Sequence, residues 1–141
     1  MKPLTREECL EFMLAQPRTA KLATVRADGR PHVAPIWFAL DGDVLYFTTW
    51  HTTVKAANLK RDPRVCLVVD DEAPPFAFVQ YEGVAHFVED MDTLLHWATI
   101  IGGRYMGADK AEAFGKRNAV PGEHLLRVEP TKIIGMDKLS E

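Results

Sequence analysis

The chain has few of the residue patterns that mark disulfide-rich, metal-binding, membrane or secreted proteins. It contains two cysteines, Cys9 and Cys66, which cannot make a disulfide framework, and the apolar run around Cys66 predicts a buried thiol. Its five histidines are scattered singly, without the spacing of a metal site. No apolar run approaches the length of a membrane span, and the first residues lack the apolar region of a signal peptide. We therefore expect a cytoplasmic protein with no metal and no membrane partner.

Patterns of catalytic side chains are missing as well. His51 has no Asp or Glu beside it in the sequence to orient it, so the chain offers no convincing nucleophile with a base. The adjacent carboxylates Glu7 and Glu8 belong to the first turn of a helix and do not indicate acid–base chemistry. A net charge of -3 argues against a nucleic-acid partner, which would need a clustered basic surface. Any catalysis is therefore expected to come from a bound cofactor.

What is present predicts one globular domain over residues 1–141. The composition, with 47% hydrophobic and 26% charged residues, is ordinary for such a domain. Turns at Asp28-Gly29 and Asp41-Gly42 separate segments of alternating polarity, and Thr5 opens a capping box. The pattern predicts strands over 18–26, 31–40, 44–49, 64–70, 76–89, 124–128 and 131–136. It predicts helices over 6–16, 53–61, 91–106 and 109–116.

Six or seven strands joined by tight turns predict a mainly β fold. Because the strands do not alternate with helices, an antiparallel barrel with peripheral helices is the economical arrangement, since closing the sheet removes its exposed edges. A flat α+β sheet covered by helices is the alternative. Gly83 predicts a bulge in its strand, and Gly102-Gly103 is expected to interrupt the helix around it.

The most informative stretch covers residues 48–64. A strand that ends in threonines leads into a loop and then a short helix, with Thr52 or Thr53 as its N-cap and Pro63 beyond its end. The unpaired N–H groups of a helix start, the hydroxyls and the charge of Lys55 together suit a phosphate. From these residues alone, an ordinary capped helix with one solvated lysine is the alternative.

A second stretch, Pro35-Ile36-Trp37-Phe38, predicts a stiff apolar wall. Proline inside a strand lies at an edge, an end or a bulge, which leaves backbone groups locally free. Such a wall can face a planar ring, with backbone amides bonding the heteroatoms of the ring. Core packing is the alternative, and it must hold for one of Trp37 and Phe38 because neighbouring side chains point to opposite faces of a strand.

The order and spacing of several such pieces resemble the pyridoxamine 5′-phosphate oxidase-like, flavin-binding split-barrel superfamily. The resemblance covers nearly the whole chain and rests on the segments Gly29–Phe38, Leu45–Thr49, Lys55–Leu59, Asp62–Val65, Val79–Gly83 and Leu126–Pro130. It implies a split-barrel homodimer that holds a flavin-like cofactor in a groove between its subunits.

The resemblance also implies site residues. Lys55 and Thr53 match the phosphate-binding lysine and hydroxyl of the family, and Thr48-Thr49 matches the strand end near the ribityl chain and phosphate. The expected cofactor-binding residues are Pro35, Ile36, Trp37, Phe38, Thr48, Thr49, Thr53, Val54, Lys55 and Asn58. No catalytic side chain and no metal ligand is expected.

Departures from the oxidase itself narrow the expected function. The oxidase carries Arg and Lys where this chain has Ala34 and Ala39, and Arg beside the phosphate lysine where this chain has Val54. The segments 35–38, 55–59 and 74–83 look closer to the actinobacterial-type branch, which uses the deazaflavin coenzyme F-420. The resemblance thus implies an oxidoreductase that moves a hydride between F-420 and a small conjugated substrate. FMN is the alternative cofactor, and a non-catalytic FMN- or haem-binding module, or a structural domain, is the alternative function.

Overall fold

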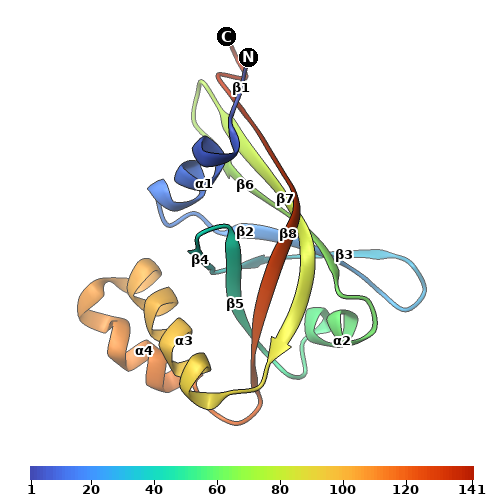
Figure 1. The fold of residues 1–141 in the computed structure, drawn as a ribbon, viewed down its shortest axis with the longest axis vertical. Helices are drawn as coiled ribbons and strands as arrows, with labels where there is room; N and C mark the ends of the chain where they lie inside the picture. The colour runs from blue at the N-terminus through green and yellow to red at the C-terminus, as the bar shows by residue number, and fades with distance from the viewer.

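The computed structural model describes all 141 residues and is dominated by one antiparallel sheet (Figure 1). Its strands are β1 (Lys2–Pro3), β2 (Ala20–Val25), β3 (Pro31–Ile36), β4 (Ala39–Asp41), β5 (Val44–Trp50), β6 (Arg64–Asp71), β7 (Ala77–Val88) and β8 (Glu123–Asp137). Its α-helices are α1 (Arg6–Ala15), α2 (Val54–Arg61), α3 (Met91–Met106) and α4 (Ala111–Asn118), with a 3-10 turn over Ala108–Lys110. The mainly β fold predicted from the sequence is confirmed.

The sheet is a barrel that does not close. The strand order is β3-β2-β6-β7-β8-β5-β4, and β1 pairs with the far end of β8. The two edge strands, β3 and β4, follow each other in the chain and are linked by Trp37-Phe38, yet they do not pair. The predicted split barrel is therefore confirmed. The single strand expected over 31–40 is two strands on opposite sides of a seam, the unpaired gap between β3 and β4.

The longest strands, β7 and β8, pair along most of their length. Two closing strands were expected, but β8 is one strand of 15 residues. It continues past Pro130 because this proline, which has no N–H to donate, lies opposite Gly83 at a register shift between Glu82 and Gly83. The bulge predicted at Gly83 is confirmed, and a Cβ there would lie 2.5 Å from the carbonyl oxygen of Glu129.

Helix α3 also departs from the expectation, because it runs through Gly102-Gly103 without interruption. These glycines serve helix packing. A Cβ on Gly102 would lie 2.6 Å from the Cβ of Phe114 on α4, and a Cβ on Gly115 would collide with Thr99 on α3. Small residues on both helices thus let α3 and α4 pack closely side by side.

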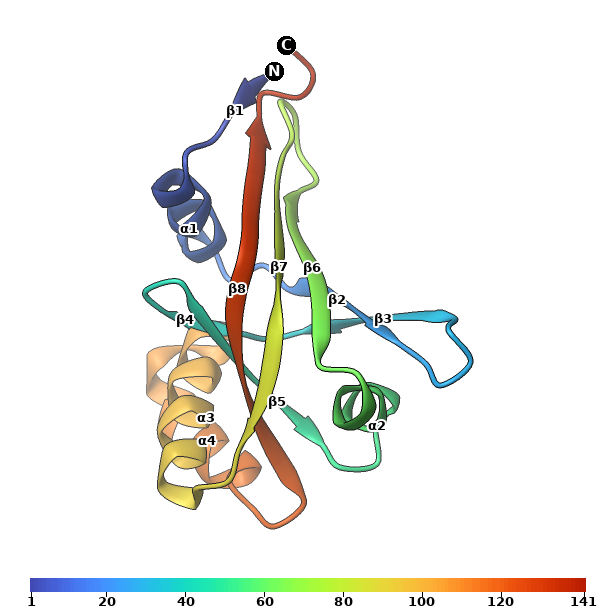
Figure 2. The same ribbon diagram turned by 45° about the vertical axis from the view of Figure 1, so that its right-hand side comes forward.

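The helices sit at distinct places around the barrel (Figure 1, Figure 2). Helix α1 closes one end with the buried side chains of Cys9 and Met13, near both chain termini. Helices α3 and α4 flank the other half of the barrel, and α2 lies on its opposite side. None of the helices has the length and apolar character needed to span a membrane.

Tyr81 is the largest fully buried side chain of the barrel interior. Its hydroxyl lies 2.6 Å from the carbonyl oxygen of Asp43, to which it donates, and 3.1 Å from that of Val128. Burial raises the pKa of this hydroxyl well above its usual range, so it keeps its proton. The contact ties the β4–β5 turn to β7 and β8.

Replacing Tyr81 by Phe is expected to lower the free energy of unfolding by about 1–2 kcal/mol, because it removes a hydrogen-bond donor from the carbonyl oxygens of Asp43 and Val128. Urea denaturation measures the change. Tyr46→Phe is the matched control, since the ring of Tyr46 stacks on Trp97 and its hydroxyl has no hydrogen-bond partner in the chain. Equal effects of the two substitutions would contradict the role given to the Tyr81 hydroxyl.

Candidate functional site

The two sequence stretches that predict a ligand site meet at one cavity of about 230 Å³. It lies on the half of the barrel flanked by α3 and α4. Its walls come from the end of β3, from β5 and from three helices, through Pro35, Ile36, Trp37, Thr48, Lys55, Ala98, Ile101 and Asn118. Five of these residues, Pro35, Ile36, Trp37, Thr48 and Lys55, belong to the set expected from the sequence.

The aromatic wall of this cavity is Trp37, whose side chain is 36% exposed. Its ring stacks on Tyr105 of α3, with centroids 5.0 Å apart and planes inclined by 6°. Phe38 is fully buried, so the expectation that one of this pair belongs to the core is confirmed. The Phe38 amide donates to the Tyr105 hydroxyl at 3.3 Å, whereas the Trp37 amide has no acceptor in the protein. A ring lying along this wall would therefore find one free N–H.

Thr53 is the N-cap of α2, and its hydroxyl is fully used within the protein. It donates to the carbonyl oxygen of Trp50 at 2.9 Å and accepts from the amide of Ala56 at 3.3 Å. The hydroxyl of Thr49 lies 2.8 Å away and supplies the remaining contact. Because a hydroxyl has one hydrogen, Thr53 has none left for a phosphate. Its role in this structure is to hold the start of the helix.

The free donors at this turn are the backbone of α2 and the Lys55 side chain. The amides of Val54 and Lys55 are in the first turn of the helix and have no acceptor. The Lys55 ammonium is half-buried, and no carboxylate or carbonyl oxygen of the chain pairs with it. Burial lowers the pKa of Lys55, and the negative charge of Glu123 opposes that shift. An unpaired, partly desolvated cation beside free N–H groups is stabilised by an anion, so the residues present fit a phosphate.

Five of the expected side chains do not line the cavity, namely Phe38, Thr49, Thr53, Val54 and Asn58. Asn58 is only 4% exposed, and its amide donates to the Thr24 hydroxyl at 3.0 Å. Arg61 donates to the Asn58 oxygen at 3.4 Å and also to the carbonyl oxygen of Val25. These contacts attach α2 to β2, and a contact of Asn58 with a ligand stays a prediction.

Sequence reasoning missed the contributions of α3 and α4. Ala98 and Ile101 are three residues apart on the apolar side of α3, a spacing that also fits ordinary core residues. Asn118 ends α4 and belongs to no recognisable motif. Only the tertiary packing of these helices against the β3–β4 seam brings such residues to the cavity.

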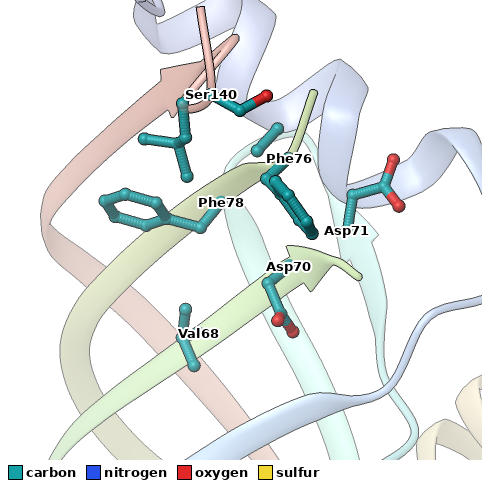
Figure 3. Close-up of a pocket in the computed structure, with 8 residues that line it drawn as sticks. Val68, Asp70, Asp71, Phe76, Phe78 and Ser140 are labelled. Atoms are coloured by element: carbon teal, nitrogen blue, oxygen red, sulfur yellow. The ribbon is translucent and has the colours of Figure 1, made fainter. Parts of the chain in front are cut away.

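A larger cavity, of about 450 Å³, lies at the other end of the barrel near the C-terminus (Figure 3). Its lining is mostly apolar, with Val68, Phe76, Ala77, Phe78 and Leu139 beside Asp70, Asp71 and Ser140. Both carboxylates already have cations, since Lys21 pairs with Asp70 at 3.0 Å and Arg18 with Asp71 at 3.5 Å. The cavity offers no unpaired cation to a phosphate, so the smaller cavity is the better candidate despite its size.

Comparison with known proteins places this geometry in a family. The model of the family described as pyridoxamine 5′-phosphate oxidase matches residues 5–137. A conserved hypothetical protein from Mycobacterium tuberculosis is 27% identical, with a TM-score of 0.84 over 98% of this chain and 89% of that one. An F420 reductase is 32% identical, with a TM-score of 0.67 over 87% of this chain and 94% of that one.

The fold is also shared with the haem storage protein HutZ from Vibrio cholerae. That protein is 22% identical, with a TM-score of 0.71 over 88% of this chain and 89% of that one. A search of curated proteins found no match. At this identity the likeness to HutZ concerns the fold alone.

Replacing Thr53 by Ala is expected to lower the free energy of unfolding by about 1 kcal/mol, because it removes the N-cap of α2. Thr52→Ala is the matched control, since Thr52 is exposed and its hydroxyl makes no hydrogen bond. Chemical denaturation of both variants measures the difference. If Thr53→Ala is no less stable than Thr52→Ala, the capping role is wrong.

Proposed function

The chain belongs to the pyridoxamine 5′-phosphate oxidase family, and from this membership we propose that it is an oxidoreductase that uses coenzyme F-420. In this proposal it moves a hydride between the deazaflavin and a small conjugated or unsaturated substrate. The observation that carries it is the half-buried, unpaired Lys55 in the same cavity as the aromatic wall of Trp37. The 32% identity to an F420 reductase over 87% of the chain supports the choice of cofactor.

The donors of the cavity suit both ends of such a ligand. The amides of Val54 and Lys55 and the Lys55 ammonium would bind its phosphate, where each hydrogen bond to a charged group contributes about 1.5–3 kcal/mol. The free amide of Trp37 would bond a heteroatom of the ring. The exposed cations Lys60 and Arg61 on the same helix suit the anionic polyglutamate tail of F-420.

The size of the cavity supports a second part of the proposal, a homodimer. Its volume of about 230 Å³ is below the roughly 300–1,000 Å³ typical of small-molecule sites. One subunit would hold the phosphate and one face of the ring, and a second copy would complete the groove. Helix α3, which lines the cavity, carries the exposed apolar side chains Met91, Leu95, Ile100 and Met106 for such a contact.

The residues of the cavity indicate which tasks fall to the protein and which to the cofactor. A reduced deazaflavin supplies the hydride when bound, so the protein has to hold the ring, align the substrate and exclude water. Trp37 and the apolar side chains of Ala98 and Ile101 would keep water from the ring. Since the residues that line the cavity include no acid–base pair, the proposal assigns the chemistry to the cofactor.

FMN is the second candidate cofactor, because its phosphate would bind the same donors. An equilibrium titration of the purified protein with FMN and with oxidised F-420, followed by fluorescence and absorbance, separates the two. Tight F-420 binding with weak FMN binding, followed by turnover of a conjugated acceptor with reduced F-420, is the expected result. The opposite preference would favour a flavoprotein, binding without turnover would favour a carrier or sensor, and binding of neither would contradict the proposal.

Lys55→Ala is expected to weaken cofactor binding at least about tenfold, equivalent to about 1.4 kcal/mol, because it removes the only side-chain cation of the cavity. Lys132→Ala is the control, since Lys132 is an exposed lysine in the half of β8 that leads away from α2. Both affinities are measured by the same fluorescence titration. Unchanged affinity in Lys55→Ala would overturn the phosphate assignment.

A further inference from the structure

Glu123 brings a negative charge to the phosphate end of the cavity. It is the first residue of β8 and lies opposite Trp50, the last residue of β5, in the antiparallel register. Directly opposed residues share a face of the sheet, and so do residues two apart on one strand. Glu123 therefore shares its face with Thr48, whose side chain lines the cavity. The strand pairing thus fixes a carboxylate beside the anion-binding donors.

The groups around the Glu123 carboxylate shift its pKa in opposite directions. Glu123 is half-buried, and burial raises its pKa, whereas the Thr48 hydroxyl and the charges of Lys55, Arg117 and His51 lower it. These groups come from β5, α2, α4 and the loop before α2. Glu123 forms no ion pair with Lys55, so the two charges act on each other at longer range. An anion bound at Lys55 would feel the same negative charge.

We propose that Glu123 shifts the selectivity of the cavity by charge, because it disfavours a doubly charged phosphomonoester more than a singly charged phosphodiester. The proposal rests on the proposed function and names the feature that would separate its two candidate cofactors. F-420 carries its phosphate as a diester between the ribityl and lactyl groups, so the phosphate itself has one negative charge, and the carboxylates of its tail belong to the part of the ligand assigned above to Lys60 and Arg61. FMN carries a monoester, which is close to doubly charged above its second pKa of about 6.

The effect of Glu123 on the preference follows from Coulomb's law. The attraction of Lys55 for the phosphate also grows with the phosphate charge, but it is shared by the wild type and Glu123→Gln, so the difference between the two proteins reports the contribution of Glu123. The repulsion between Glu123 and a bound phosphate is proportional to the phosphate charge, so it is twice as large for a dianion as for a monoanion. Affinity depends exponentially on this energy. If neutralising Glu123 strengthens binding of a monoanion about threefold, it strengthens binding of a dianion by the square of that factor, about tenfold.

The test measures the affinities of FMN and F-420 for the wild type and for Glu123→Gln at pH 8, by fluorescence titration. We expect Glu123→Gln to bind FMN about tenfold more tightly and F-420 about threefold more tightly than the wild type does. The ratio of the F-420 affinity to the FMN affinity should therefore fall. Glu129→Gln is the matched control, because Glu129 is an exposed glutamate of the same strand that pairs with Arg127 at 3.2 Å. It should leave both affinities unchanged.

Two further measurements separate charge from shape. Glu123→Asp keeps the charge and should keep the wild-type preference. The difference in affinity between wild type and Glu123→Gln should shrink as the pH falls and Glu123 takes up a proton, because the wild type then also lacks the negative charge. This comparison uses F-420, because its phosphodiester keeps one charge over the pH range, whereas FMN loses charge below its second pKa of about 6 and the difference would shrink for that reason alone.

The outcomes are distinct from those that test the cofactor assignment itself. If Glu123→Gln gains equal affinity for FMN and F-420, or gains affinity for neither, the role of Glu123 is overturned while F-420 binding stays in place. A loss of the preference in Glu123→Asp would also overturn it, since the charge is retained. Failure of the wild type to bind either ligand would overturn the proposed function, and this inference with it.

Discussion

The seam between β3 and β4 is the constraint on which the candidate site depends. The chain crosses there from one edge of the sheet to the other without a ladder of hydrogen bonds, so another element must hold the crossing. Tyr105 of α3 does so, because its ring stacks on Trp37 while its hydroxyl accepts from the Phe38 amide and donates to the Arg18 carbonyl oxygen at 2.8 Å. Burial raises the pKa of Tyr105, which keeps this donor protonated. The aromatic wall and α3 are thereby fixed as one unit.

A second consequence is the division between groups that shape the site and groups left free in it. The hydroxyls of Thr49 and Thr53 satisfy each other and the helix start, and Asn58 attaches α2 to β2. Because of these contacts, three side chains are not available to donate to a ligand. The same contacts hold the backbone amides of α2 in place. Rigid backbone N–H groups lose little entropy when they bind an anion, which makes them better preorganised than flexible side chains.

The parts predicted correctly from the sequence are those set by neighbouring residues. The capping box at Thr5, the N-cap expected at Thr52 or Thr53 and the turn at Gly29 depend on a few adjacent residues, and the structure has all three, with Thr53 as the cap. The wrong expectations concerned contacts between residues far apart in sequence. Helix α3 continues through Gly102 because Phe114 packs there, which no local pattern reveals. In the same way, the motifs indicated Lys55 and Trp37, whereas Ala98, Asn118 and Glu123 reach the site only through the packing of distant segments.

The positive charges of α2 differ in what they can contribute to binding. Lys60 and Arg61 are exposed, so their attraction for an anion is screened over a Debye length of about 8 Å at physiological salt. On a chain of net charge -3 they form a local positive patch, which favours the approach of an anionic ligand more than its retention. Lys55 is half-buried, so its charge is screened less and it stabilises the anion once the anion is bound. Glu123 lies near that inner charge. The outer cations are therefore suited to attract any anion, while the inner pair of opposite charges is suited to distinguish one anion from another.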